Sequence, residues 1–72
     1  MWQLRIYNES GKWFSTARIQ AYYESDYSVC QKITEEIQAN LKHWQQSVTW
    51  EVFHNNQNVT GWYLSVLKDN ES

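Results

Sequence analysis

Cysteine, proline and glycine are almost missing from this 72-residue chain, which has one Cys, two Gly and no Pro. A single cysteine excludes an internal disulfide and a thiolate-rich zinc site. Two isolated glycines cannot build a glycine-rich phosphate loop. No stretch approaches the roughly 18 apolar residues of a membrane span, and the first residues lack an apolar run of signal-peptide length. We therefore expect a cytoplasmic protein with no membrane partner.

An excess of either charge is also missing. Six Lys and Arg stand against eight Asp and Glu, giving a net charge of −2. Because Asp69 and Glu71 lie in the last four residues, the charges of residues 1–68 sum to zero. A duplex-DNA binder usually has a basic patch that displaces counterions from phosphates. Duplex DNA is therefore a disfavoured partner.

The length allows one domain with a small core. Hydrophobic residues make up 42% of the chain and charged residues 19%, which is too apolar for a disordered protein. We predict a single folded domain over residues 1–68 and a polar, frayed tail over residues 69–72. A core this small leaves little room for an internal substrate or cofactor cavity, and we expect no cofactor.

Alternation of apolar and polar residues predicts a first β-hairpin. Residues 2–7 have the period of two that is typical of a strand with one buried face. Residues 8–11, Asn-Glu-Ser-Gly, predict a turn. A second strand is predicted over residues 13–23, with Trp13 on the buried face and Phe14 on the other.

The period then changes to that of an amphipathic helix, which we predict from about Ser28 to Gln46. Its apolar stripe comprises Val29, Cys30, Ile33, Ile37, Leu41 and Trp44. Ser25, Asp26 and Ser28 can each cap its N-terminus. The exact first residue is open by about one turn.

The remaining residues predict a second hairpin. Residues 48–53 alternate again, and the Asn-rich residues 54–58 predict a tight turn. A fourth strand is expected over residues 59–67, with Trp62 inward and Tyr63 outward. The predicted fold is α+β: two β-hairpins flank one amphipathic helix (ββαββ), and the helix covers one face of a four-stranded, mainly antiparallel sheet.

The other face of this sheet is predicted to be aromatic. Our candidate partner-binding residues on it are Arg5, Tyr7, Phe14, Arg18, Tyr22, Phe53 and Tyr63. Aromatic residues beside arginines are enriched at protein–protein hot spots. Any one of these aromatics is explained more simply as a cross-strand pair on a solvated sheet. Five on one uncovered face favour a binding surface, because large apolar patches are uncommon on monomers.

Residues that could support catalysis are few. Cys30 and His43 lie thirteen positions apart on one predicted helix, about 20 Å at 1.5 Å per residue, which is too far for proton transfer. Cys30 with His54 stays open, although a cysteine on an apolar helical face is usually a buried hydrophobe. A metal-binding His-x-x-x-His pair is missing. We therefore expect neither an enzyme nor a metal site.

These observations favour a non-enzymatic protein-binding module, an inhibitor or adaptor that occupies a site on a larger protein with its aromatic face or an exposed strand edge. A homodimer through the open sheet face would bury the same residues. In general style the chain resembles the small accessory proteins of bacteriophages and other mobile elements, many of which inhibit host enzymes or defence systems. The alternative is single-stranded nucleic-acid binding, with bases stacked on the same aromatics, and neutral charge disfavours it.

Overall fold

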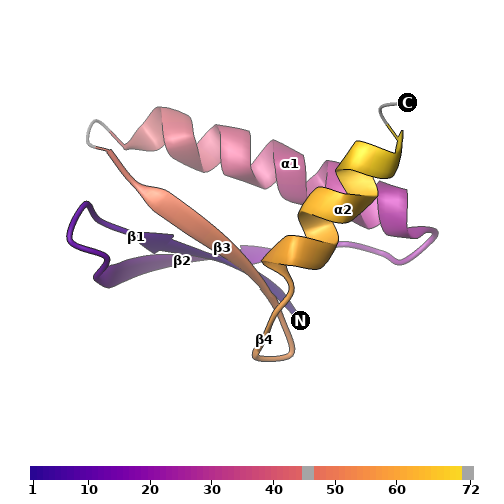
Figure 1. The fold of residues 1–72 in the computed structure, drawn as a ribbon, viewed down its shortest axis with the longest axis horizontal. Helices are drawn as coiled ribbons and strands as arrows, with labels where there is room; N and C mark the ends of the chain where they lie inside the picture. The colour runs from indigo at the N-terminus through magenta and orange to yellow at the C-terminus, as the bar shows by residue number, and fades with distance from the viewer. Residues whose placement is uncertain (45–46, 71–72) are drawn as a thin grey trace.

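The computed structural model describes residues 1–44 and 47–70. In these two ranges the elements are β1 (Trp2–Tyr7), β2 (Trp13–Ile19), α1 (Asp26–His43), β3 (Thr49–His54), β4 (Gln57–Asn58) and α2 (Thr60–Asn70). The strands form one antiparallel sheet in the order β2-β1-β3-β4. Figure 1 shows α1 running along this sheet, with α2 crossing at one end. The predicted α+β fold with a four-stranded antiparallel sheet is confirmed.

The hydrophobic core lies between the two helices and one face of the sheet. The register places Leu4 opposite Ala17 in β2 and opposite Val52 in β3, so their side chains share that face. The buried hydrophobic side chains in the described ranges are Leu4, Ile6, Ile19, Val29, Cys30, Ile33, Ile37, Val52 and Tyr63. The sheet contributes Leu4, Ile6, Ile19 and Val52 to this core, and the partly buried Trp2, Ala17 and Trp50 pack against it.

Helix α1 begins at Asp26 because Ser25 caps it. The Ser28 N–H donates to Ser25 Oγ at 3.1 Å, and the Ser25 N–H donates to Ser28 Oγ at 3.1 Å. This reciprocal pair satisfies two backbone donors at the helix N-terminus. The helix ends at His43, and Trp44 adopts an extended conformation. The predicted end at Gln46 lies outside the described residues.

The predicted fourth strand over residues 59–67 is wrong, because most of it is helical. Strand β4 is limited to Gln57–Asn58. The Thr60 N–H and hydroxyl both donate to Asn58 Oδ1, at 3.0 and 2.8 Å. The Tyr63 N–H then donates to Val59 O at 3.0 Å, which is the first i to i−4 bond of α2. The Asn58 side chain therefore ends the strand pairing and turns the chain into a helix.

The apolar residues of this segment also fit a helical period. Val59, Trp62, Tyr63, Val66 and Leu67 follow the spacing i, i+3, i+4, i+7 and i+8, and all five are at least partly buried. The predicted strand would place Leu64 on the inward side with Trp62, but Leu64 is 52% exposed in the structure. The helix runs on to Asn70, into the stretch predicted to be a tail, and residues 71–72 lie outside the described ranges.

A β-bulge in the first hairpin exchanges the predicted facing of Trp13 and Phe14. Ile6 pairs with Ser15, whereas Tyr7 pairs with Trp13, so Phe14 is an extra residue on β2. Trp13 thereby shares a face with Tyr7. The Phe14 ring meets Trp44, at the end of α1, edge-to-face with 4.9 Å between centroids. Phe14 is therefore directed to the helix side, opposite to the prediction.

Candidate binding surface

The sheet face opposite the two helices is called the outer face, and no element in the described ranges covers it. Both helices pack on the other side, since the Trp62 ring of α2 stacks on Trp2 with 5.4 Å between centroids. Register and strand alternation place these residues on the outer face: Gln3, Arg5, Tyr7, Trp13, Thr16, Arg18, Thr49, Glu51, Phe53 and Asn58.

Three residues from three strands form an aromatic–arginine cluster at the centre of the outer face: Arg5, Trp13 and Phe53. The Arg5 guanidinium carbon lies 3.7 Å from the centroid of the Phe53 ring and 4.5 Å from that of the Trp13 ring. Such cation–π contacts stabilise by about 0.5 to 2 kcal/mol each. The Arg5 Nε atom is buried and has no hydrogen-bond partner among the described residues. The guanidinium is thus held by its two aromatic neighbours and by the adjacent Tyr7 hydroxyl.

A polar row lies beside the cluster. The Asn58 amide donates to Glu51 Oε2 at 2.7 Å. Partial burial raises the pKa of Tyr7, a hydrogen bond to Glu51 and the charge of that carboxylate raise it further, and the neighbouring Arg5 opposes this rise. The Tyr7 phenol is therefore a protonated hydrogen-bond donor at neutral pH, and Glu51 is already engaged.

Four of the seven predicted partner-binding residues are on the outer face: Arg5, Tyr7, Arg18 and Phe53. Three are elsewhere, and their predicted placement is wrong. Phe14 is displaced by the bulge described above. Tyr22 follows the end of β2 at Ile19 and is 89% exposed in an irregular segment. The side chains of Phe14 and Tyr22 therefore do not join the aromatic–arginine cluster.

Tyr63 is the third misplaced residue. It lies in α2 and is only 3% exposed. Its hydroxyl and Thr34 Oγ1 are 2.6 Å apart in a hydrogen bond with α1, and its ring meets Trp50 edge-to-face with 5.8 Å between centroids. A helix in place of the predicted strand moves this side chain from the outer face into the core.

Trp13 is the residue that sequence reasoning missed. It is 50% exposed, and its Nε1–H donates to both Ser15 O and Thr16 Oγ1, each 3.0 Å from Nε1. Strict alternation from Ser15 and Ala17 placed it inward. Pairing the chain outward from the predicted turn at residues 8–11 would match Tyr7 with Lys12 and Ile6 with Trp13, so the predicted turn also gives the wrong partner for Trp13.

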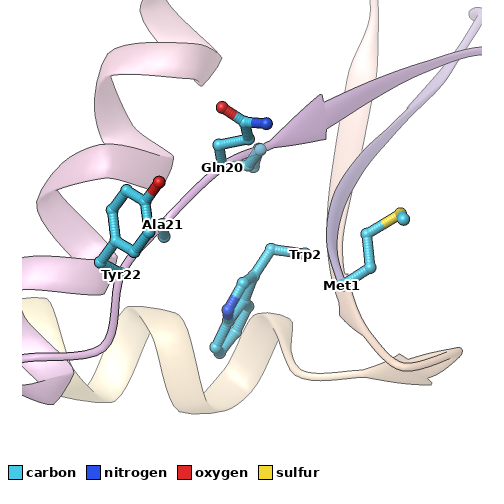
Figure 2. Close-up of a pocket in the computed structure, with 6 residues that line it drawn as sticks. Met1, Trp2, Gln20, Ala21 and Tyr22 are labelled. Atoms are coloured by element: carbon cyan, nitrogen blue, oxygen red, sulfur yellow. The ribbon is translucent and has the colours of Figure 1, made fainter.

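An open hollow lies at the end of the sheet near α2, away from the cluster. Its volume is about 370 Å³, and Met1, Trp2, Gln20, Ala21 and Tyr22 are among the residues that line it. Figure 2 shows the Trp2 indole directed toward the α2 ribbon, with Gln20, Ala21 and Tyr22 across from it. The lining brings together no nucleophile and general base, so it suggests no reaction.

Cys30 is fully buried in α1, and we predict that it is unreactive. Burial raises the pKa of its thiol from 9.0 to about 11, and the Asp26 carboxylate adds to this rise. The thiolate is the reactive form, so a thiol reagent should modify the native protein slowly. Rapid labelling of the folded protein would contradict this prediction.

The same shift predicts a pH dependence of stability. Above pH 9 the unfolded chain loses the Cys30 proton while the folded protein retains it until about pH 11. The unfolding free energy should therefore be unaffected below pH 9 and fall by up to about 2 to 3 kcal/mol as the pH rises through 11. Tyrosines also titrate in this range, so the measurement is the difference between wild type and Cys30→Ala in denaturant titrations. Parallel pH profiles would contradict the prediction.

No metal centre, membrane-spanning helix or relative assigns a function to the described residues. Within residues 1–44 and 47–70, no three His, Cys, Asp or Glu side chains are grouped as metal ligands. No helix in those ranges is long and apolar enough to cross a membrane. No protein-family model matches the chain, and comparison with curated proteins and with solved structures finds no match.

Proposed function

We propose that this protein is a non-enzymatic binding module, an inhibitor or adaptor, that occupies a site on a larger protein through its outer face. The observation that carries the proposal is the aromatic–arginine cluster on an uncovered sheet face. Trp, Tyr and Arg are the residues most enriched at interface hot spots, which lie near the centre of an interface. Arg5, Trp13 and Tyr7 supply all three types within one patch.

The geometry of the cluster suits recognition because it is largely preorganised. The Trp13 indole is hydrogen-bonded within its own strand, and Arg5 is stacked between two rings. Ordering a free side chain at an interface costs about 0.5 to 1.5 kcal/mol. Side chains that are already held avoid much of this cost, so contact with a partner yields more net affinity.

Truncating the cluster should weaken binding strongly. We expect Trp13→Ala or Phe53→Ala to reduce affinity for the partner by about 2 kcal/mol or more, roughly 30-fold. The partner is first found by affinity capture with the wild-type protein, and its affinity for each variant is then measured by titration. Leu64→Ala is the matched control, because Leu64 is an exposed apolar residue of α2 outside the cluster.

Two outcomes separate the possible occupants of the outer face. A captured protein that is lost with Trp13→Ala and Phe53→Ala but kept with Leu64→Ala supports the proposal. A wild-type dimer in sedimentation that both cluster variants dissociate means that a second copy covers the face. Unchanged capture and unchanged oligomeric state in both cluster variants would contradict the proposal and leave the cluster as ordinary cross-strand pairing.

Single-stranded nucleic acid is a second candidate, favoured by the half-exposed Trp13 ring beside Arg5 and by the exposed Arg18. Bases stack on such rings while arginines contact phosphates. Affinity for a short oligothymidine would then fall steeply between about 50 and 200 mM salt. An aromatic protein interface responds weakly to the same change.

A further inference from the structure

No strand among residues 1–44 and 47–70 pairs with the outermost edge of the sheet at β2. Strand β2 is the terminal strand of the described sheet, pairs there only with β1, and contains no proline over its seven residues. In the described structure, residues 20–24 continue this edge without a hydrogen bond to another backbone group. A long free edge is a template for another strand, and proteins usually blunt it. This edge adjoins the outer face, but it would bind through main-chain N–H and C=O groups, whereas the outer face would bind through side chains.

The direction of the free backbone groups follows from the hydrogen bonds of Val52. Its N–H donates to Thr60 Oγ1 at 2.9 Å, and its C=O accepts from Val59 N–H at 2.8 Å. The main-chain groups of Val52 are therefore directed away from β1. Leu4 is directly opposite Val52 in β1, so its own groups are directed the other way, toward β2.

Leu4 meets Ala17 in β2, and these two residues form a hydrogen-bonded pair. Main-chain groups alternate along an antiparallel strand, so those of Thr16 and Arg18 are directed out of the sheet. Two N–H and two C=O groups are thus available to a further strand. The hydrogen bonds between β2 and β1 do not use these groups of Thr16 and Arg18.

The charge of this edge indicates what it binds. Strand β2 carries Arg18 and no acid, Lys12 lies directly before it, and the continuing residues 20–24 carry one acid, Glu24, at their far end. A second copy paired antiparallel about the middle of this edge would bring the two Arg18 side chains directly or diagonally opposite each other, which is unfavourable. An acidic strand would place carboxylates beside them.

A hollow gives the edge a place for a side chain. It has a volume of about 400 Å³ and lies between residues 20–24, of which Tyr22 and Glu24 line it, and α1, where Ser28 and Lys32 line it. A strand that continues past Ile19 along the edge would reach this hollow. In strand addition, main-chain bonds give affinity and such pockets give specificity.

We propose that the free edge of β2 accepts an extended, acidic segment of a partner protein as a fifth strand. This rests on the proposed function in taking the ligand to be a protein, and it adds the binding mode and the chemistry of the bound segment. Alternate side chains of the segment would be acidic where they lie beside Arg18 on the outer face.

The test removes single backbone donors. Cys30 is the only cysteine, so synthetic fragments 1–29 and 30–72 can be joined at it, with one amide replaced by an ester. An ester at the Arg18 N–H removes an outward donor and keeps the side chain. An ester at the Ala17 N–H is the matched control, because it removes a donor to β1. The probes are fluorescein-labelled Thr-Val-Glu-Val-Glu-Val-Thr-amide and its counterpart with Lys in place of Glu.

We expect the Glu peptide to bind at least about 10-fold more tightly than the Lys peptide. The Arg18 ester should weaken Glu-peptide binding about 3- to 10-fold while the Tm stays near that of the unmodified protein. The Ala17 ester should lower the Tm. Equal binding of the two peptides, failure of the Glu peptide to bind, or unchanged affinity in the Arg18 ester overturns the proposal. So does a wild-type dimer that the Arg18 ester dissociates, since a second copy would then occupy the edge.

The experiments can overturn the outer-face proposal and the strand-addition proposal independently of each other. If Phe53→Ala loses the captured partner while the Arg18 ester keeps it at full affinity, strand addition is overturned and the outer face stands. If the Arg18 ester weakens both the partner and the Glu peptide while Phe53→Ala weakens neither, strand addition is supported and the outer-face proposal fails.

Discussion

Replacing Ile33 with alanine is expected to lower the free energy of unfolding by about 2 to 5 kcal/mol. Ile33 has no exposed surface and lies in the middle of α1, in the cluster that joins the helix to the sheet. Truncation removes buried methyl groups and leaves a cavity that a small core cannot easily close. Small domains have only about 5 to 15 kcal/mol of stability, so the variant should unfold at a much lower denaturant concentration.

Leu41→Ala is the matched control in the same helix. The sequence predicts Leu41 in the buried stripe and a comparable loss on its truncation, but the side chain is 41% exposed. The expected cost is therefore less than about 1.5 kcal/mol. Ile37, which is 6% exposed, should behave like Ile33. If Ile33→Ala and Leu41→Ala have the same denaturation midpoint, α1 does not pack on the sheet as described.

Tyr63→Ala should cost about 3 to 5 kcal/mol of stability. The sequence places Tyr63 on the outer face, where truncation would weaken binding and change stability little. The structure reverses that expectation, because the ring is buried against Trp50 and the hydroxyl is hydrogen-bonded to Thr34. Denaturant titration of the variant measures the loss.

Tyr63→Phe isolates the hydroxyl from the ring. We expect a loss of about 1 kcal/mol, because Thr34 Oγ1 retains its hydrogen bond to Cys30 O at 2.9 Å. The difference between the Ala and Phe variants is then the contribution of ring packing between α2, α1 and β3. A Tyr63→Ala variant with wild-type stability but weakened partner binding would mean that Tyr63 is a surface residue.

The sequence predicts an element correctly when that element's own residues show an uninterrupted apolar period. Strands β1 and β3 alternate without interruption, and α1 repeats its apolar residues at helical intervals and has a serine cap. Segment 59–67 was ambiguous, because Trp62, Leu64 and Val66 alternate while Trp62, Tyr63 and Val66 have helical spacing. The choice depends on Asn58, whose side chain binds Thr60 and starts the helix.

The candidate surface was predicted in part for the same reason. Arg5 and Phe53 lie in regular strands, so alternation alone assigns them to one face, opposite the apolar residues that the core needs. Trp13 lies beyond a bulge, and one extra residue reverses the facing of everything on its far side. The stacking of Arg5 on Trp13 could therefore not be derived from the periodicity of either strand.

The sequence by itself determined the α+β class, the helix with its buried face and the neutral, cysteine-poor composition, because these follow from residue types and their local spacing. Only the tertiary structure decided that Tyr63 belongs to the core, that Trp13 joins Arg5 and Phe53, and that β2 ends the sheet. The physical reason is that facing across a bulge, the position of α2 and strand order depend on contacts between residues distant in the chain. Those contacts outweigh local preferences that are individually worth less than about 1 kcal/mol.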